Sequence, residues 1–457
     1  MTTAVILAAG EGKRMQSRRP KVLHEICGYP MLAHVIHAAR SVCSDVIVVV
    51  GHQGEEIRAA FGDSVVYAEQ HEQLGTAHAL LQAEPLLPDA GTVLVLCGDT
   101  PLLSPGAIEE LYAVHSREAA AATVLTATVP NPFGYGRIVR GAGGEIIKIV
   151  EEKDATAAEK LLREINTGTY AFDVKALREG LAGVGSDNAA GEYYLTDCIE
   201  LIIKSGKKVA TSLLPDYRLA LGVNDRIQLA EAQALLQERI NRDLMAAGVT
   251  MINPATIYVD AGVKVGRDTV ILPNTALRGR TVVGEGCVIG PQTEITDSTI
   301  GSGSHIRHSV VTESILEENV TVGPFTHLRP GTVLKNGVKV GDFVEIKQSQ
   351  VGEGSKIPHL SYIGDAEIGS GVNLGGGTIV VNYDGRKKYK TVVADGAFVG
   401  CNSNLVAPVT IGRGAFVAAG STITNDVPAG ALSLARARQV DKPGLGARLL
   451  GHKDDEN

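Results

Sequence analysis

Residues 259–289 read VDAGVKVGRDTVILPNTALRGRTVVGEGCVI, and this stretch decides the fold of the C-terminal half of the chain. Within it an aliphatic residue returns at every sixth position, a period that belongs to neither a helix nor a strand. A fixed period of this kind is typical of a solenoid, whose repeats stack on their neighbours. The aliphatic positions of the three runs that keep this register are Val259, Val265, Ile271, Leu277, Val283, Ile289 and Ile295, then Val322, Leu328, Leu334, Val340 and Ile346, then Val399, Leu405, Ile411, Val417 and Ile423.

Six residues make one short strand and one turn, and three such segments close a triangular coil with the aliphatic side chains inside. One coil cannot bury its own core, so the coils must stack. About 165 residues at 18 per coil predict roughly nine coils and a prism on the order of 40 Å long. Many inward aliphatics precede a glycine, as in Val265-Gly266 and Ile411-Gly412, where we expect a corner.

The repeat resembles the hexapeptide of left-handed parallel β-helices. The left hand is taken from this resemblance, because crossovers between parallel strands are otherwise right-handed. The flat faces of such a prism suit packing as a homotrimer.

The composition excludes several classes of protein. A net charge of −8 over 457 residues argues against a general nucleic-acid-binding or anionic-membrane-binding surface, whereas small acidic ligands remain compatible with a local basic pocket. The six cysteines form no C-x-x-C pair, which predicts reduced thiols in a cytoplasmic protein and no zinc site. We find neither a signal peptide nor a transmembrane pattern.

The N-terminal half alternates buried strands with helical segments. Residues 3–7, 45–50 and 92–96 are continuous apolar runs, which predict a parallel sheet covered on both faces. In this Rossmann-like, doubly wound arrangement ligands bind at the carboxyl ends of the strands. The loops after Leu7 and Leu96 are therefore the expected binding loops.

The first loop, residues 8–14, reads AAGEGKR and is followed by Pro20-Lys21. It matches neither the dinucleotide fingerprint, because Met15 stands at the third glycine position, nor the spacing of a P-loop. The combination L-x-x-G-x-G-x-R with a following P-K resembles sugar-nucleotide pyrophosphorylases, which usually have threonine where this chain has Lys13. The alternative is a glycine turn with solvated charges.

The second loop carries Asp99 at the end of a buried strand. A carboxylate together with nucleotide phosphates is a suitable ligand set for Mg²⁺. The alternative is that Asp99 caps a helix.

Further short motifs follow in order: LGTAH at 74–78, GYGR at 134–137, INTG at 165–168 and GVN at 222–224. Together they resemble the nucleotidyltransferase domain of bifunctional N-acetylglucosamine-1-phosphate uridyltransferases and glucosamine-1-phosphate acetyltransferases. We interpret His78 as a helix-surface histidine and not as a base. The roles that the resemblance implies are UTP contacts from Leu7, Ala8, Gly10 and Gly12, phosphate contacts from Arg14 and Lys21, uracil contacts from Gln70, Gly75 and Thr76, sugar contacts from Gly136, Glu151 and Asn166, and Mg²⁺ ligands in Asp99 and Asn224.

Residues 225–247 have leucine and isoleucine at helical spacing, no internal glycine or proline, and Gly248 as a stop. We expect one helix here that links two domains. The predicted domains are a nucleotidyltransferase domain at 1–224, the linker helix at 225–248, a β-helix acetyltransferase domain at 249–435 and a tail at 436–457.

The repeat breaks between Val380 and Val393, across the basic segment NYDGRKKYK at 382–390. This loop is either a tolerated surface insertion or an arm that reaches a neighbouring subunit's site. His359 follows the inward Ile357 by two positions and should therefore lie outside the core, where a neutral imidazole can accept a proton from an amine. Glu345 is our candidate for orienting the imidazole, and an ordinary surface histidine is the alternative.

This half of the chain also resembles the same bifunctional family, in the motifs R-P-G, E-x-K, S-K-x-x-H-L-x-Y and N-Y-D-G. Relatives commonly have alanine for Gly376 and serine for Cys401, and a thiol is the poorer donor; we do not interpret Cys401 as a nucleophile. The resemblance implies His359 as the base, Arg329, Lys347, Tyr362, Asn373, Asn382 and Tyr383 around glucosamine 1-phosphate, and Gly376, Cys401, Ala419 and Arg436 around acetyl-CoA.

The sequence therefore predicts a homotrimeric cytoplasmic enzyme of UDP-N-acetylglucosamine synthesis, and through it of peptidoglycan synthesis, that acetylates glucosamine 1-phosphate and then couples the product to UTP. One alternative is a single-activity nucleotidyltransferase with a structural or regulatory β-helix. Another is a trimeric scaffold that only binds sugar nucleotides.

Overall fold

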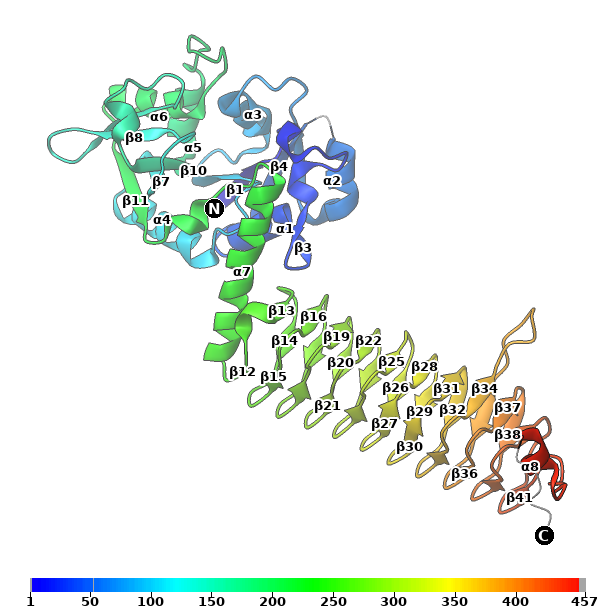
Figure 1. Ribbon diagram of the computed structural model, residues 1–457. Coiled ribbons are helices and arrows are strands. Elements are labelled where there is room, and N and C mark those ends of the chain that lie inside the picture. The colour runs from blue at the N-terminus through cyan, green and yellow to red at the C-terminus, as the bar shows by residue number, and fades with distance from the viewer. Residues whose placement is uncertain (1, 52, 452–457) are drawn as a thin grey trace. The chain divides into compact units, whose positions relative to one another are not determined.

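The computed structural model describes residues 2–51 and 53–451, and the end of the predicted tail, residues 452–457, lies outside this part of the chain. The chain separates into two compact units, with the boundary between Arg239 and Ile240. That boundary falls inside α7 (Arg226–Ala246), which confirms one continuous helix where the sequence predicts the linker (Figure 1). The functional domain limits at 224 and 248 stay predictions.

The first unit is built on a nine-stranded sheet. Strands β1 (Thr2–Leu7), β4 (Asp45–Val50) and β6 (Thr92–Cys97) are parallel, as predicted, and β5 (Val66–Glu69) continues the parallel part beside β4. The sheet as a whole is mixed, because β10 (Glu164–Asp173) runs antiparallel to both β6 and β7 (Ala122–Thr128). This reversal differs from the parallel sheet that the sequence predicts. The main strand order is β11-β7-β10-β6-β1-β4-β5, with β11 at Val209–Leu214, and the hairpin of β8 (Arg137–Arg140) and β9 (Ile146–Val150) joins through β10.

Alternation along the strands gives the sheet two apolar faces. In β1, Ala4 and Ile6 belong to one core cluster while Val5 belongs to another, so both faces are covered. Continuous apolar runs are what such a doubly covered sheet requires. Helices α1 (Met31–Ala39), α2 (Gly54–Phe61) and α4 (Pro105–Arg117) contribute to the first cluster, and α3 (Thr76–Ala83), α5 (Val174–Leu181) and α6 (Leu195–Lys204) to the second.

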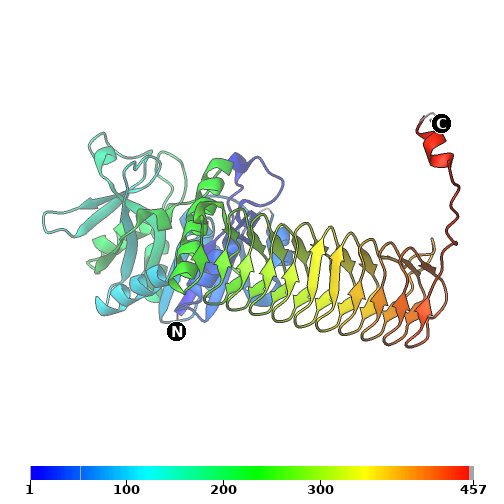
Figure 2. The same cartoon turned by 60° about the horizontal axis from the view of Figure 1, so that its bottom comes forward.

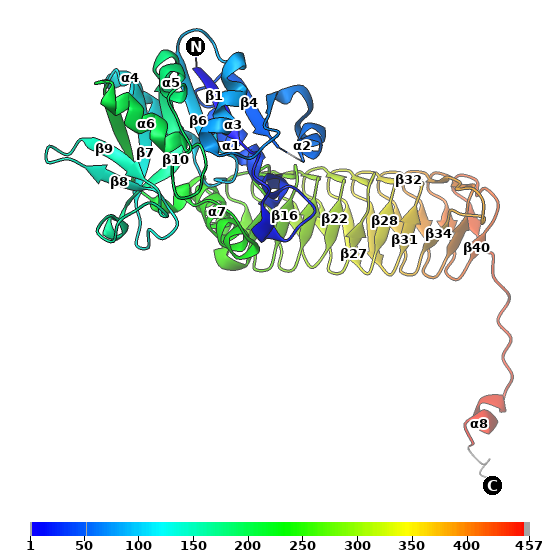
Figure 3. The ribbon, with the colours of Figure 1, turned by 90° about the horizontal axis from the view of Figure 1, so that it is seen from above.

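The second unit is a solenoid of three parallel sheets. The first sheet runs from β12 (Thr250–Met251) to β41 (Leu432–Ser433), the second from β13 (Tyr258–Val259) to β40 (Thr422–Ile423), and the third from β14 (Lys264–Val265) to β38 (Val409–Ile411). Figure 2 shows the stacked coils, and Figure 3 shows strands of the second sheet in line from β16 (Ala276–Arg278) to β40. The chain ends its described part after a short helix, α8 (Leu445–Leu449).

The inward positions predicted from the sixfold period form one continuous core. Ile271, Leu277 and Leu334 have no exposed surface, and of the predicted set only Val265 is partly exposed while still packing on the core. The stretch between Ile295 and Val322, where the sixfold count fails, continues the solenoid by shortened coils, since Ile300, Val311 and Leu316 are also inward.

Glycine after an inward aliphatic is explained by close approach between coils. A Cβ on Gly266 would lie 2.6 Å from the backbone carbon of Gly284, and one on Gly412 would lie 2.5 Å from the backbone nitrogen of Ala429. Any larger residue would therefore push neighbouring coils apart. The loop between β34 (Ile379–Val381) and β35 (Thr391–Val393) protrudes from the solenoid, as predicted for the basic segment (Figure 1).

Candidate active sites

The loop after β1 forms one wall of a cavity of about 330 Å³ in the first unit. Hydrogen bonds from Ala8 N to Val49 O and from Gly98 N to Leu7 O, each 2.9 Å, hold the loop at the carboxyl edge of the sheet. Gly12 has a φ of +62° and a Cβ there would lie 2.7 Å from Lys21 Cβ, so only glycine fits. The residues that line the cavity are Leu7, Ala8, Ala9, Gly10, Lys21, Val22, Gln70, Gln73, Gly75, Thr76, Ala79, Cys97, Asp99 and Glu192.

Lys21, Asp99 and Asn224 converge on one point at this edge. The Lys21 ammonium contacts the Asp99 carboxylate and donates to Asn224 Oδ1 at 3.2 Å. A backbone bond of 2.9 Å from Val223 N to Asp99 O ties the two loops together. Two oxygens of the kind that Mg²⁺ prefers as ligands therefore face a single cation here, the Lys21 ammonium.

Gly136, just before β8, and Glu151, just after β9, lie close to Asn166 in the first part of β10. Asn166 N donates to Gly136 O at 2.9 Å, and a Cβ on Gly136 would lie 3.3 Å from Glu151 Oε1. Glu151 accepts a bond of 3.1 Å from Thr196 Oγ1. Burial raises the pKa of the Glu151 carboxyl, although the Thr196 hydroxyl opposes this effect.

Arg14, a predicted phosphate-binding residue, lies apart from the other predicted residues of this unit. It lies in the 3-10 turn Lys13–Met15 with an exposed side chain, and it lines neither the 330 Å³ cavity nor a second cavity of about 250 Å³ that the same loop borders. Its phosphate role stays a prediction. The Lys13 ammonium pairs with the Glu11 carboxylate at 2.6 Å.

In the solenoid, the corner between the first and second sheets carries one exposed column of residues. In each coil the column residue follows the inward aliphatic by two positions, so Asp342 lies beside His359 in β27 (Lys339–Asp342) and β30 (Lys356–His359). Backbone bonds of 3.0, 3.3, 2.8 and 2.8 Å connect successive corners. The members of this corner column are Asp342, His359, Gly376, Cys401 and Ala419, and Arg436 Nη1 donates to Ala419 O at 2.8 Å.

Asp342 is the acidic partner of the imidazole within this chain. Its Oδ1 lies 2.5 Å from His359 Nδ1, and the hydrogen bond from the imidazole holds the pKa of Asp342 below its usual range. An ionised carboxylate on Nδ1 leaves Nε2 as the proton acceptor. Glu345, which we expected in this role, instead accepts a bond of 2.7 Å from Arg329.

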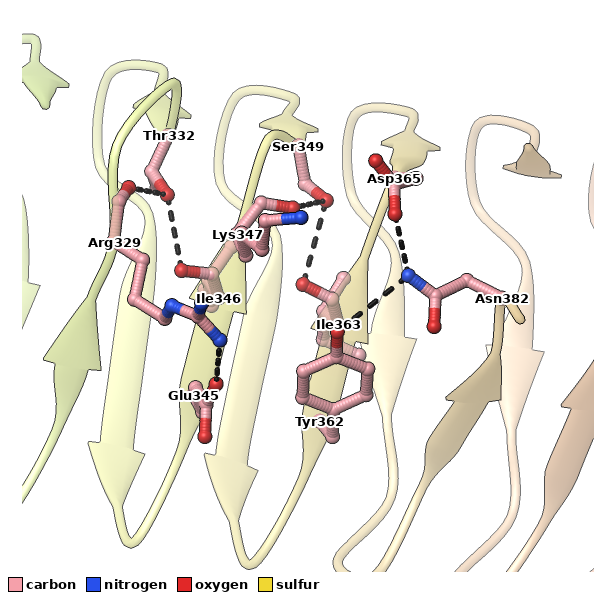
Figure 4. A network of polar contacts seen from close by, with 10 residues as sticks. All are labelled: Arg329, Thr332, Glu345, Ile346, Lys347, Ser349, Tyr362, Ile363, Asp365 and Asn382. Carbon is pink, nitrogen blue, oxygen red and sulfur yellow. Dashed lines mark hydrogen bonds and ion pairs between the residues drawn. The ribbon is translucent and has the colours of Figure 1, made fainter. Parts of the chain in front are cut away.

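A second group of predicted residues lies on the second sheet and at its edge with the third sheet (Figure 4). Asn382 is buried, and its amide donates to the Asp365 carboxylate and, at 3.5 Å, to the Tyr362 hydroxyl. Arg329 and Lys347 occupy successive coils beside them (Figure 4). The neighbouring ammonium of Lys388, on the protruding loop, lowers the pKa of Lys347, while the Asp365 carboxylate opposes this effect.

The remaining predicted residues lie apart from this group. Asn373 projects from the first sheet, between Lys356 and Phe398. Tyr383 is exposed on the protruding loop, and its hydroxyl donates to Gly385 O at 2.8 Å. One chain therefore places the imidazole at one edge of the second sheet and the cations at the other.

Sequence reasoning missed Asp342, Asp365 and Lys388 as individual site residues. The signal for Asp342 was present: it follows Val340 by two positions, as His359 follows Ile357. Lys388 was included only as part of a basic loop, and Asp365 had no distinguishing pattern.

Curated proteins similar along almost the whole chain share one name. "Bifunctional protein GlmU" of Geobacillus sp. is 54% identical over 98% of this chain and 98% of its own, and that of Brevibacillus brevis is 53% identical over 96% of each. The chain belongs to the GlmU family. The protein of the same name from Heliobacterium modesticaldum is 53% identical over 99% of this chain and 98% of its own.

Three family models match this chain, one within the first unit and two within the second. A "MobA-like NTP transferase domain" matches residues 4–166, a "GMPPB C-terminal domain" matches 253–351, and "Bacterial transferase hexapeptide (six repeats)" matches 390–425. With the stacked parallel sheets, these matches establish a Rossmann-like nucleotidyltransferase domain followed by a left-handed parallel β-helix.

Two features are absent from the described residues, 2–51 and 53–451. No helix there has the length and apolar character needed to cross a bilayer. That part of the chain also holds no cluster of three histidine, cysteine, aspartate or glutamate side chains arranged for a metal ion.

Proposed function

We propose that the protein makes UDP-N-acetylglucosamine in two steps. The β-helix transfers the acetyl group of acetyl-CoA to glucosamine 1-phosphate, and the N-terminal domain then transfers UMP from UTP to N-acetylglucosamine 1-phosphate and releases pyrophosphate. The observation that carries this proposal is the imidazole of His359, oriented by Asp342 on an exposed corner of a solenoid whose structure requires neither side chain. Membership of a family named bifunctional supports two activities in one chain.

Uridyl transfer needs little acid or base chemistry. The nucleophile, a phosphate oxygen of the sugar, is already an anion, and it attacks the α-phosphorus as pyrophosphate leaves. Alignment and cationic groups therefore supply most of the rate. Lys21 contributes an ammonium beside the phosphates, while Gly136, Glu151 and Asn166 hold the sugar.

Asp99 and Asn224 would hold Mg²⁺, because their oxygens already converge on the Lys21 ammonium and hard oxygen ligands suit this ion. The bound ion would neutralise charge on the phosphates.

Acetyl transfer needs a base, because the sugar amine attacks the thioester only when it is unprotonated. His359 Nε2 accepts the amine proton, Asp342 stabilises the resulting imidazolium, and the thiolate of CoA leaves. Gly376, Cys401, Ala419 and Arg436 would contact acetyl-CoA along the corner column. The closely spaced cations Arg329, Lys347 and Lys388 fit the phosphate of glucosamine 1-phosphate.

The acetyltransferase site is complete only when chains associate. On one chain His359 and the cations Arg329 and Lys347 lie at opposite edges of the second sheet, so a neighbouring chain would supply the missing half. We therefore propose a homotrimer. Co-expressing His359→Ala with Lys347→Ala chains should restore acetyl transfer that neither variant has alone, and a monomeric mass in solution would contradict this arrangement.

Two substitutions test the assignment of the two activities. His359→Ala should abolish CoA release from acetyl-CoA and glucosamine 1-phosphate but leave pyrophosphate release from UTP and N-acetylglucosamine 1-phosphate, and Asp99→Ala should do the reverse. If the parent protein releases no CoA, it is a single-activity nucleotidyltransferase; if it releases neither product, it is a binding scaffold. A cytoplasmic location remains our prediction, in keeping with six free cysteines.

A further inference from the structure

Gln70 stands at the end of β5 with its amide held from two sides. Its side chain is 4% exposed and lines the 330 Å³ cavity. Gln70 Nε2 lies 3.2 Å from Gly75 O and 3.0 Å from His78 Nδ1. The backbone nitrogen of Gln70 donates to Val50 O at 2.8 Å, which fixes the residue against the sheet.

The carbonyl of Gly75 determines which way the amide of Gln70 points. A carbonyl oxygen only accepts hydrogen bonds, so the atom of Gln70 that faces it must be the NH₂ group. The same nitrogen then donates to His78 Nδ1, which must be unprotonated. The imidazole therefore carries its proton on Nε2. The Gln82 amide nitrogen donates to His78 O at 3.2 Å and lies 3.3 Å from that ring nitrogen, so it is the more distant of the two amides and not its hydrogen-bond acceptor.

The Gly75 carbonyl is itself held in place. Gly75 has a φ of +120°, and a Cβ there would lie 2.5 Å from Tyr193 O, so the backbone is packed against the Tyr193 segment. Tyr193 N donates to Leu74 O at 2.8 Å, and Ala77 N donates to Tyr193 O at 2.9 Å. The Tyr193 ring also lies 6.4 Å from the His78 ring, centroid to centroid.

We propose that His78 is a positioning residue that selects the base of the nucleotide. Together with Gly75 it holds both hydrogens of the Gln70 amide, so Gln70 presents its oxygen to the cavity. An oxygen at this point accepts a hydrogen bond from the N3–H of uracil and faces the bare N3 of cytosine unfavourably. The inference rests on the proposed function, because it requires Gln70 to meet the base of UTP.

The test compares kcat/KM for UTP and CTP in the full-length protein, with pyrophosphate release as the readout. His78→Ala removes the acceptor while keeping a good helix former in α3. Losing one neutral hydrogen bond that fixes the amide should lower the preference for UTP over CTP about tenfold. His78→Asn places an acceptor oxygen near the position of Nδ1 and should restore most of the preference.

Two controls separate positioning from general damage. Gln82→Ala removes a neighbour of the other ring nitrogen and should leave the UTP preference unchanged, and CoA release at the His359 site should stay at the parent level in every variant. An equal loss for UTP and CTP in His78→Ala, or a His78→Asn variant no better than His78→Ala, would overturn the proposal. A parent protein that releases no pyrophosphate from UTP would instead overturn the proposed function, and this inference with it.

Discussion

Replacing Asp342 with asparagine tests how His359, the proposed acetyltransferase base, is held. The carboxylate accepts a hydrogen bond from His359 Nδ1 at 2.5 Å, which fixes the tautomer whose Nε2 is free to take a proton. An asparagine amide can donate to Nδ1 as readily as it accepts from it, so the opposite tautomer, with its proton on Nε2, becomes populated. The variant also loses the negative charge that stabilises the imidazolium formed during the reaction.

The size of the effect follows from the exposure of the pair. In a buried serine-protease triad the same change lowers the rate about 10⁴-fold. Within a single chain 59% of the His359 side chain and 36% of the Asp342 side chain are exposed, so the pair sits at the surface of the solenoid, where water screens charges. We therefore expect kcat for acetyl transfer to fall roughly 10- to 100-fold, which is less than the loss of up to about 10⁴-fold expected when the base itself is removed.

Glu345→Gln is the matched control, because Glu345 is the acid that the sequence favoured and the structure pairs with Arg329 at 2.7 Å. CoA release would be measured for both variants with acetyl-CoA and glucosamine 1-phosphate, and pyrophosphate release should be unchanged in both. Glu345→Gln should act mainly on KM for glucosamine 1-phosphate, through Arg329. The assignment of Asp342 would be refuted if kcat of Asp342→Asn stayed within twofold of the parent value while Glu345→Gln was severely impaired.

Three further predictions concern other parts of the chain. Lys388→Ala should raise the pKa of Lys347 towards its ordinary value and increase KM for glucosamine 1-phosphate, measured by NMR titration and CoA release. Burial raises the pKa of the Glu151 carboxyl, so the folded state loses stability as the pH rises through that pKa. Glu151→Gln should therefore have a higher melting temperature than the parent at pH 8, and the difference should disappear towards pH 4.5. Equal melting curves at both pH values would contradict this prediction. Leu334→Ala, at a fully buried position, should lower the free energy of unfolding of the solenoid by about 2–5 kcal/mol in urea titrations without changing pyrophosphate release.

The fold was largely predictable because its signals are periodic. Inward positions such as Leu277 and Val340 repeat with the coil, and each one has only one possible neighbour above and below. The antiparallel strand β10 was not predictable in this way, because an apolar strand buried on both faces reads the same in either direction. Its direction depends on where the β8–β9 hairpin returns the chain, which is a tertiary property.

The position of a candidate site residue was predictable where it depends only on the loop that carries the residue. Lys21, Asp99 and Asn224 converge because they follow the ends of elements at one edge of the sheet. Pairings between side chains were less accessible: nothing local to Glu345 shows that it faces Arg329 and not His359. Likewise, the contact of His78 with Gln70 depends on the backbone path of residues 71–75, and helical spacing alone favoured a surface histidine.

Coil register, and not distance along the chain, brings the proposed acetyl-CoA contacts together. Gly376 and Cys401 are separated by the protruding loop, yet Asn402 N donates to Gly376 O at 2.8 Å, as neighbouring coils do elsewhere. The insertion is tolerated because it leaves β34 and re-enters at β35, at a corner, so that Val393 still pairs with Ile368. From His359 to Ala419 the column then rises by three strand spacings of about 4.8 Å, on the order of 14 Å in all. A row of this length along an exposed corner suits an extended arm such as pantetheine, with its thioester next to the imidazole. The regular core therefore sets the spacing of the site, and the residues two positions beyond it supply the chemistry.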